Sequence, residues 1–168
     1  MGMKVKLWGV RGSLPTPRHP AVQSEHLQKL MYDFFDSGFN KKTEIEAYIN
    51  SQPRYKVGGF GGNTLCVEVT TNKTKIIIDG GSGLKSLGAE LLSTEFGKGQ
   101  GELHLLMTHF HWDHLIGIPF FAPIFIPGNK INIYSVQDTA EALYERFFKN
   151  PTFQYLTKHS VQLLFFIN

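Results

Sequence analysis

Residues 102–114 read ELHLLMTHFHWDH, in which an apolar strand, Glu102–Met107, leads directly into four residues that can bind a metal ion. The four are His109, His111, Asp113 and His114. Side chains two positions apart in an extended segment point the same way, so His109 and His111 can converge on one cation. Asp113 and His114 follow where the strand gives way to a loop, and they can turn toward a second cation. Imidazole nitrogen and carboxylate oxygen together suit Zn²⁺, and also Mn²⁺ or Fe²⁺.

The non-functional alternative is a group of surface histidines that binds no metal. Four potential metal ligands within six residues are improbable by chance, so we prefer a metal site. His104 is different, because it lies inside the strand and out of phase with the cluster. We expect it to be a packed core histidine and not a ligand.

Composition places the chain among ordinary globular domains. Its 168 residues are 42% hydrophobic and have a net charge of +3, which fits one domain with a real core. The longest basic run is Lys41–Lys42, so we do not expect a nucleic acid as partner, although the sequence does not exclude one. A single cysteine, Cys66, suits a reducing compartment. No signal peptide or membrane segment is apparent, and the expected location is the cytoplasm.

Hydrophobic periodicity predicts alternating strands and helices along most of the chain. The predicted strands are Lys4–Val10, Leu65–Val69, Lys75–Asp79, Glu102–Met107, Lys130–Tyr134 and Val161–Ile167. The predicted helices are Ala21–Ser37, a short one ended by Pro53, Leu84–Leu92, and one from Asp138 to about Lys149. This order indicates an α/β domain.

Several further segments, taken with the histidine cluster, resemble one known family. They are Leu7–Ser13 with Pro15–Pro17, Gly61–Val69, Ile76–Leu84, Trp112 and Gly117–Phe121. Together they are similar to the phosphodiesterase-like branch of the metallo-β-lactamase superfamily, which includes the carbon–phosphorus lyase phosphodiesterase and the tRNA 3′-processing endonuclease. Residues 19–57 stand out from this resemblance as a helical insertion.

The resemblance implies the N-terminal portion of an αββα sandwich that carries two zinc ions at one edge of its sheets. His109 and His111 would bind the first metal, and Asp113 and His114 the second. Asp113 would also be catalytic, because it would aim a hydroxide held between the metals at the substrate. Asp79 would brace the metal loop from behind; alternatively, it only forms a turn before two glycines.

Two more residues are candidates for binding substrate. Arg11 and Asn63 could reach a substrate phosphate, since a guanidinium forks onto phosphate oxygens. Alternatively, both residues only fix loop geometry. The implied substrate is a small phosphodiester, and the runner-up is a carbonyl ester, lactone or thioester, which the same hydroxide can attack.

The family completes its site with ligands that come later in the chain, and these have no convincing match here. Asp138 and His159 are the only candidates after His114, and neither lies in the expected surroundings. We therefore expect residues 1–168 to be a single domain truncated at its C-terminus. Either another chain supplies the missing half, through a homo-oligomer or a complementing C-terminal half, or the chain is a catalytically incomplete half-domain that serves as a binding module.

Overall fold

The computed structural model describes residues 2–59, 61–71, 74–135, 149 and 161–165, the last five by their backbone alone. The chain divides into two units. The first consists of Met1–Pro15 and Asn63–Asn168, and the second is Thr16–Gly62. The helical insertion expected at residues 19–57 lies within the second unit.

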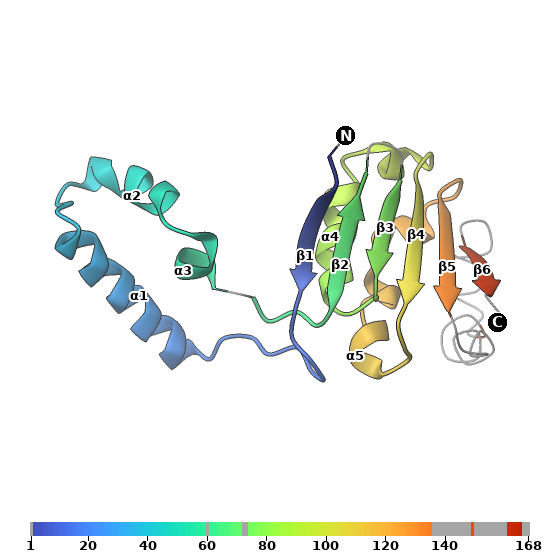
Figure 1. Ribbon diagram of the computed structural model, residues 1–168, viewed down its shortest axis with the longest axis horizontal. Helices are drawn as coiled ribbons and strands as arrows, with labels where there is room; N and C mark the ends of the chain where they lie inside the picture. Colours follow the sequence, from blue (N-terminus) through green and yellow to red (C-terminus); the bar gives the residue numbers. More distant parts are fainter. Residues whose placement is uncertain (1, 60, 72–73, 136–148, 150–160, 166–168) are drawn as a thin grey trace. The chain divides into compact units, whose positions relative to one another are not determined.

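The first unit is built on one mixed sheet of six strands in the order β1-β2-β3-β4-β5-β6 (Figure 1). The strands are β1 (Lys4–Gly9), β2 (Cys66–Thr70), β3 (Lys75–Ile78), β4 (Glu102–Met107), β5 (Lys130–Ser135) and β6 (Val161–Phe165). The pairs β1–β2 and β2–β3 are antiparallel, and β3 to β6 run parallel. A parallel pair requires a crossover between its strands, and helical segments supply it between β3 and β4.

The predicted α/β class is confirmed, and most elements lie where the periodicity places them. The predicted hairpin joins β2 to β3, with the Thr71 N–H donating to the Thr74 carbonyl at 3.0 Å. The helix predicted at Leu84–Leu92 is α4 (Gly83–Leu91), and the final predicted strand is observed over Val161–Phe165 as β6. The helix predicted from Asp138 to Lys149 falls outside the described residues.

One face of the sheet packs against helices and forms the core. Inward-facing side chains of β3, β4 and β5 alternate with outward-facing ones, as the period of a strand requires. Leu84, Leu87 and Leu91 come from α4 to meet them, at the i, i+3, i+7 spacing of one helix face. The 3₁₀ segments η2 (Glu95–Lys98), η3 (Ile118–Phe120) and η4 (Ala122–Phe125) add Phe96, Ile118 and Ile124 to this core.

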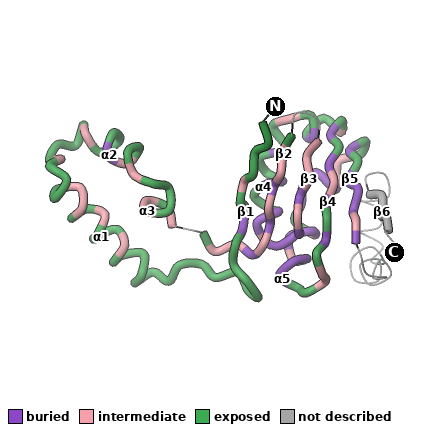
Figure 2. Tube along the Cα trace, in the orientation of Figure 1, coloured by how far each residue is buried: buried purple, intermediate pink, exposed green. Residues whose placement is uncertain are grey.

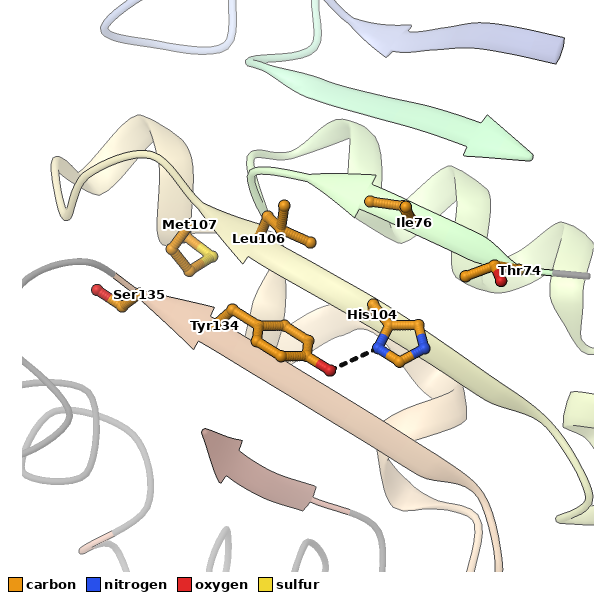
Figure 3. A pocket seen from close by; sticks show the side chains of 7 residues that line it. All are labelled: Thr74, Ile76, His104, Leu106, Met107, Tyr134 and Ser135. Carbon is orange, nitrogen blue, oxygen red and sulfur yellow. Dashed lines mark hydrogen bonds between the residues drawn. The ribbon is translucent and has the colours of Figure 1, made fainter. Parts of the chain in front are cut away.

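The other face of the sheet is apolar but not covered to the same degree. Val5, Leu7 and Leu106 are exposed on it, and a hollow of about 430 Å³ lies over β3, β4 and β5 (Figure 3). Its lining residues are Thr74, Ile76, His104, Leu106, Met107, Tyr134 and Ser135. The prediction of a packed core histidine is wrong in one respect, because His104 is half-buried on this face and its Nδ1 lies 2.7 Å from the Tyr134 hydroxyl. The described part of the first unit thus has one helical layer and one sheet.

The second unit consists of helices α1 (Pro20–Asp36), α2 (Ile45–Ser51) and α3 (Arg54–Gly58), with the 3₁₀ turn η1 (Lys42–Glu44) before α2. Its centre is a small aromatic cluster in which the rings of Phe34, Phe39 and Tyr48 lie 5.2–5.5 Å apart. Tyr48 is buried, whereas α1 has no buried residue along its 17 residues (Figure 2). Within the described parts of the chain, no helix is long and apolar enough to cross a membrane.

Candidate metal centre

The candidate site lies at the carboxyl ends of β3 and β4. Parallel strands bring their carboxyl ends to the same edge of a sheet, so Asp79 after β3 lies beside the histidine cluster after β4. The Asp79 N–H donates to the Leu106 carbonyl at 2.9 Å, which holds the two strand ends together. The tertiary structure therefore brings Asp79 and the histidine cluster to the same edge of the sheet.

A glycine turn allows the backbone of the motif to approach this edge closely. The Gly80 N–H donates to the His114 carbonyl at 2.8 Å, and the Gly117 N–H donates to the Gly80 carbonyl at 2.9 Å. A Cβ on Gly81 would lie 2.5 Å from the carbonyl oxygens of both Asp113 and Leu65, a distance that no side chain tolerates. The glycines after Asp79 are thus required by backbone packing against the motif.

The cluster itself bends into a short helix. His111 is the N-cap of α5 (Trp112–Leu115), so Asp113 and His114 lie in a helical turn and not in the loop expected from sequence. The His109 ring lies 4.5 Å from the His111 ring and 3.9 Å from the His114 ring, measured between centroids. The structure therefore brings the three predicted imidazole ligands together.

Asp79 is wholly buried and contacts the cluster through Thr108. Its Oδ1 accepts from the Thr108 N–H and its Oδ2 from the Thr108 hydroxyl, each at 2.8 Å. The same hydroxyl oxygen lies 3.0 Å from His109 Nδ1. Since the hydroxyl proton is donated to the carboxylate, the oxygen can only accept from His109, which assigns the His109 proton to Nδ1 and leaves the Nε2 lone pair for a metal.

Asp79 acts on His114 directly. Its Oδ2 lies 3.0 Å from His114 Nδ1, although this buried nitrogen has no aligned hydrogen bond within the described residues. The carboxylate nevertheless favours a proton on the nitrogen that it faces, so the His114 Nε2 lone pair is also left for a metal. One buried carboxylate thus orients the protons of two predicted ligands.

Asp113 is held from the N-terminal loop. The Ser13 N–H donates to Asp113 Oδ2 at 3.0 Å, and Ser13 has a φ of 60°, a conformation that non-glycine residues rarely adopt. Burial raises the pKa of the Asp113 carboxyl, but the Ser13 N–H and the neighbouring histidines outweigh it, and the net pKa lies below its usual value. The carboxyl group is therefore ionised, and thus able to bind a cation, over the neutral range.

The donor set fits a divalent metal on its chemistry. His114 Nε2 faces Asp113 Oδ2 at 3.2 Å, and two lone-pair donors at that distance repel unless a proton or a cation lies between them. Two ligands of one tetrahedral Zn²⁺ are about 3.3 Å apart. No group of three or more donors in the described part of the chain is already arranged around one point. The residues present therefore offer part of a metal site, with further ligands needed to complete it.

The two predicted substrate-binding residues lie in the same loop system. The Asn63 carbonyl accepts from the N–H groups of Val10 and Arg11 at 3.0 and 2.9 Å, and its side-chain oxygen accepts from the Ser82 hydroxyl at 3.0 Å. Arg11 is exposed and pairs through its backbone with Thr64. These contacts fix loop geometry, and a role for either residue in binding substrate stays a prediction.

Sequence reasoning assigned no role to Thr108 or Ser13. Thr108 immediately precedes the first predicted ligand, and its hydroxyl could have been identified from the sequence as a candidate hydrogen-bond partner of that ligand. Ser13 acts through its backbone N–H across 100 positions of sequence, so no side-chain pattern could have indicated it. Asp138 and His159, the later candidates, lie outside the described residues.

Known proteins resemble this chain both in sequence and in structure. A family model described as the metallo-beta-lactamase superfamily matches residues 57–141, about half of the chain, including Asp79 and the whole cluster. No curated protein matches. A diphosphatase from the PhnP family is similar in structure at 17% identity and a TM-score of 0.45, over 70% of this chain and 41% of that one. The metallo-beta-lactamase fold protein YhfI from Bacillus subtilis is similar at 22% identity and a TM-score of 0.41, over 62% of this chain and 39% of that one. The chain thus spans about two fifths of the length of these two proteins.

Proposed function

The chain belongs to the metallo-β-lactamase superfamily, and from this premise we propose that it contributes the first part of the active site of a zinc-dependent phosphodiesterase. The observation that supports the proposal is the close approach of the His109 ring to those of His111 and His114. Asp79 and Thr108 lie behind this cluster and determine which nitrogen of His109 and of His114 carries the proton. The proposed location is the cytoplasm. The proposed substrate is a small phosphodiester, because Arg11 on an adjacent loop offers a guanidinium to its phosphate.

In this proposal, the residues of the chain would bind the metal ions and orient the attacking water. His109, through Nε2, and His111 would hold one Zn²⁺, and Asp113 and His114 a second. Two bound zinc ions would supply a nucleophile at neutral pH by lowering the pKa of a water. Asp113, ionised and held by the Ser13 N–H, would accept a hydrogen bond from that water and aim it. Asp113 is thus the residue we propose as catalytic.

Completion of the site would come from other residues. Four donors cannot satisfy two metals, and the open apolar face over β3, β4 and β5 lacks a covering layer of the kind that α4 gives the other face. We propose that a complementing half, or a second copy, supplies the missing ligands. The alternative is a catalytically incomplete half-domain that binds a metal or a partner without turnover.

Metal binding tests the site without depending on activity. Titration of the purified chain with Zn²⁺, followed by calorimetry and by elemental analysis after dialysis, is expected to give at least one bound zinc per chain. His109→Ala together with His111→Ala is expected to abolish the tighter binding. The matched control is His26→Ala, which removes a histidine of the second unit that bonds to Val57 and leaves the cluster intact. Less than one zinc per chain, or equal loss in the control, would contradict the proposal.

Turnover distinguishes the substrate classes. Bis(p-nitrophenyl) phosphate and p-nitrophenyl acetate would be offered to the zinc-loaded chain, alone and with any complementing half. Turnover of the diester that is lost in Asp113→Ala supports the phosphodiesterase. Turnover of the acetate alone would favour the ester, lactone or thioester alternative, and zinc binding without either activity would favour the incomplete half-domain.

A further inference from the structure

Helix α1 has an uncharged apolar stripe on which no other described residue of the second unit packs closely enough to bury it. Leu27, Met31 and Phe35 recur at the i, i+4, i+8 spacing of one helix face, and they are 50%, 63% and 58% exposed. Ile45 at the start of α2 continues the surface and is 48% exposed. We call these four residues the α1 stripe.

The second unit cannot cover the stripe from its own residues. Its 47 residues, Thr16–Gly62, contain one buried hydrophobic side chain among those described, that of Tyr48. A unit below about 60 residues rarely supplies a sufficient core by itself and commonly gains it by association. Contiguous exposed apolar residues of this kind mark an interaction surface.

We propose that the α1 stripe is the contact surface between two copies of this chain, with α1 packed antiparallel to α1 about a two-fold axis at Met31. The stripe suits its own copy because Leu27 and Phe35 lie four residues on either side of Met31, so each meets the other across the axis. Such a pair uses the same patch on both copies, as a two-fold contact requires. The proposal is independent of the proposed function.

Charge and area both favour a second copy as the occupant. The residues that share or flank this helix face, Ser24, Gln28 and Tyr32, are uncharged, so pairing with itself brings no like charges together on the stripe. With about 200 Å² for a large side chain, the α1 stripe and Tyr32, which is 63% exposed, leave about 560 Å² uncovered on each copy. A symmetric pair would bury about 1,100 Å², which exceeds the roughly 1,000 Å² needed for a specific interface but lies at the small end of the range.

A hollow beside the stripe offers a place for one side chain of the second copy. It has a volume of about 170 Å³ and lies between α1 and α2. Its lining is apolar except for one tyrosine: Leu30, Met31, Phe34, Phe35, Ile45, Tyr48 and Ile49. A flat contact would leave this hollow empty, whereas a knob from the opposite helix fills it and adds dispersion contacts.

Sedimentation velocity of the full chain between about 1 and 200 µM tests the proposal. The wild type is expected to show a concentration-dependent dimer, and Met31→Glu is expected to weaken it at least about 30-fold, because two carboxylates then meet at the axis. The matched control is Val22→Glu, which places the same charge on a residue that is also exposed, about 180° around α1. Circular dichroism would verify that each variant keeps its helices, and Phe35→Glu replaces Met31→Glu if that variant does not fold.

Disulfide trapping gives a second readout. Met31→Cys lies on the proposed axis and is expected to form a linked dimer under mild oxidation, whereas Val22→Cys is not; the native Cys66 is buried and does not compete. A wild type that stays monomeric at 200 µM would overturn the proposal. So would a dimer that persists in Met31→Glu but dissociates in Leu106→Glu, since that result would assign the contact to the open face of the sheet.

Discussion

Replacement of Asp79 separates its role in folding from its role in preparing the metal ligands. Asp79 is wholly buried, has a φ of 61°, and accepts two hydrogen bonds from Thr108. Asp79→Asn keeps the shape, an acceptor for the Thr108 N–H, and a side chain that tolerates this left-handed conformation. Asp79→Ala removes all three.

The expected cost in stability differs between the two variants. In Asp79→Ala the Thr108 N–H loses its partner, at about 1–3 kcal/mol, and the left-handed backbone adds about 1–2 kcal/mol. A loss of about 2–5 kcal/mol in total is a large part of the roughly 5–15 kcal/mol that stabilises an ordinary domain. Asp79→Asn is expected to lose about 1 kcal/mol.

Metal affinity is expected to fall in the variant that still folds. An amide NH₂ in place of Oδ2 faces His114 Nδ1 and favours the tautomer with its proton on Nε2, the nitrogen that a metal needs. Loss of such a carboxylate typically weakens metal binding about 10–100-fold. Calorimetric Zn²⁺ titration would measure this loss, and long-range ¹H–¹⁵N spectra of the metal-free chain would report the protonated nitrogen of each histidine.

A matched variant tests whether Asp79 acts on His109 through the Thr108 hydroxyl. Thr108→Val removes the hydroxyl between Asp79 and His109 but leaves Asp79 beside His114, so only the His109 tautomer is expected to change. The reasoning is refuted if Asp79→Asn folds, binds Zn²⁺ as tightly as the wild type and leaves both histidine tautomers unchanged.

Three further predictions concern the first unit. Burial raises the pKa of the Cys66 thiol to about 12, so the native chain is expected not to react with Ellman's reagent at pH 8 and to expose one reactive thiol in urea; reaction at the same rate in both would contradict the burial. Burial raises the pKa of the Glu68 carboxyl, but the hydrogen bonds from Lys75 and Trp8 outweigh burial, and the net pKa lies below its usual value. The stability that Glu68 contributes is therefore present above about pH 4.5 and is lost as the pH falls through the folded pKa. Urea unfolding should therefore show Glu68→Gln less stable than the wild type at pH 7 and nearly equal to it in acid. Gly81→Ala is expected to lose about 1–3 kcal/mol or more through overpacking, whereas Gly12→Ala, with nothing within 4 Å of the added carbon, should be near neutral; equal unfolding midpoints would be inconsistent with the close approach.

Local sequence pattern was sufficient to predict most helices and strands, and to select candidate metal donors. The alternation in β4 and β5 and the helical spacing in α1 and α4 predict those elements within one or two residues, because each pattern depends on neighbours in sequence. The cluster of His109 to His114 is likewise contiguous, so its residue types indicate metal chemistry before any fold is known. The position of Asp79 behind the cluster was implied only by the family resemblance, and the parallel pairing of β3 with β4 that brings the two together is seen in the tertiary structure.

Contacts between distant segments needed the tertiary structure. The short helix α5, the carboxylate that sets two histidine tautomers, and the Ser13 N–H on Asp113 depend on backbone atoms brought together from segments up to 100 residues apart. Backbone groups have no sequence signature of their own, and a left-handed φ at Ser13 or Asp79 is imposed by its surroundings. The exposed side of α1 is a similar case: periodicity predicts an apolar face, but only the packing of α2 shows which part of that face remains uncovered.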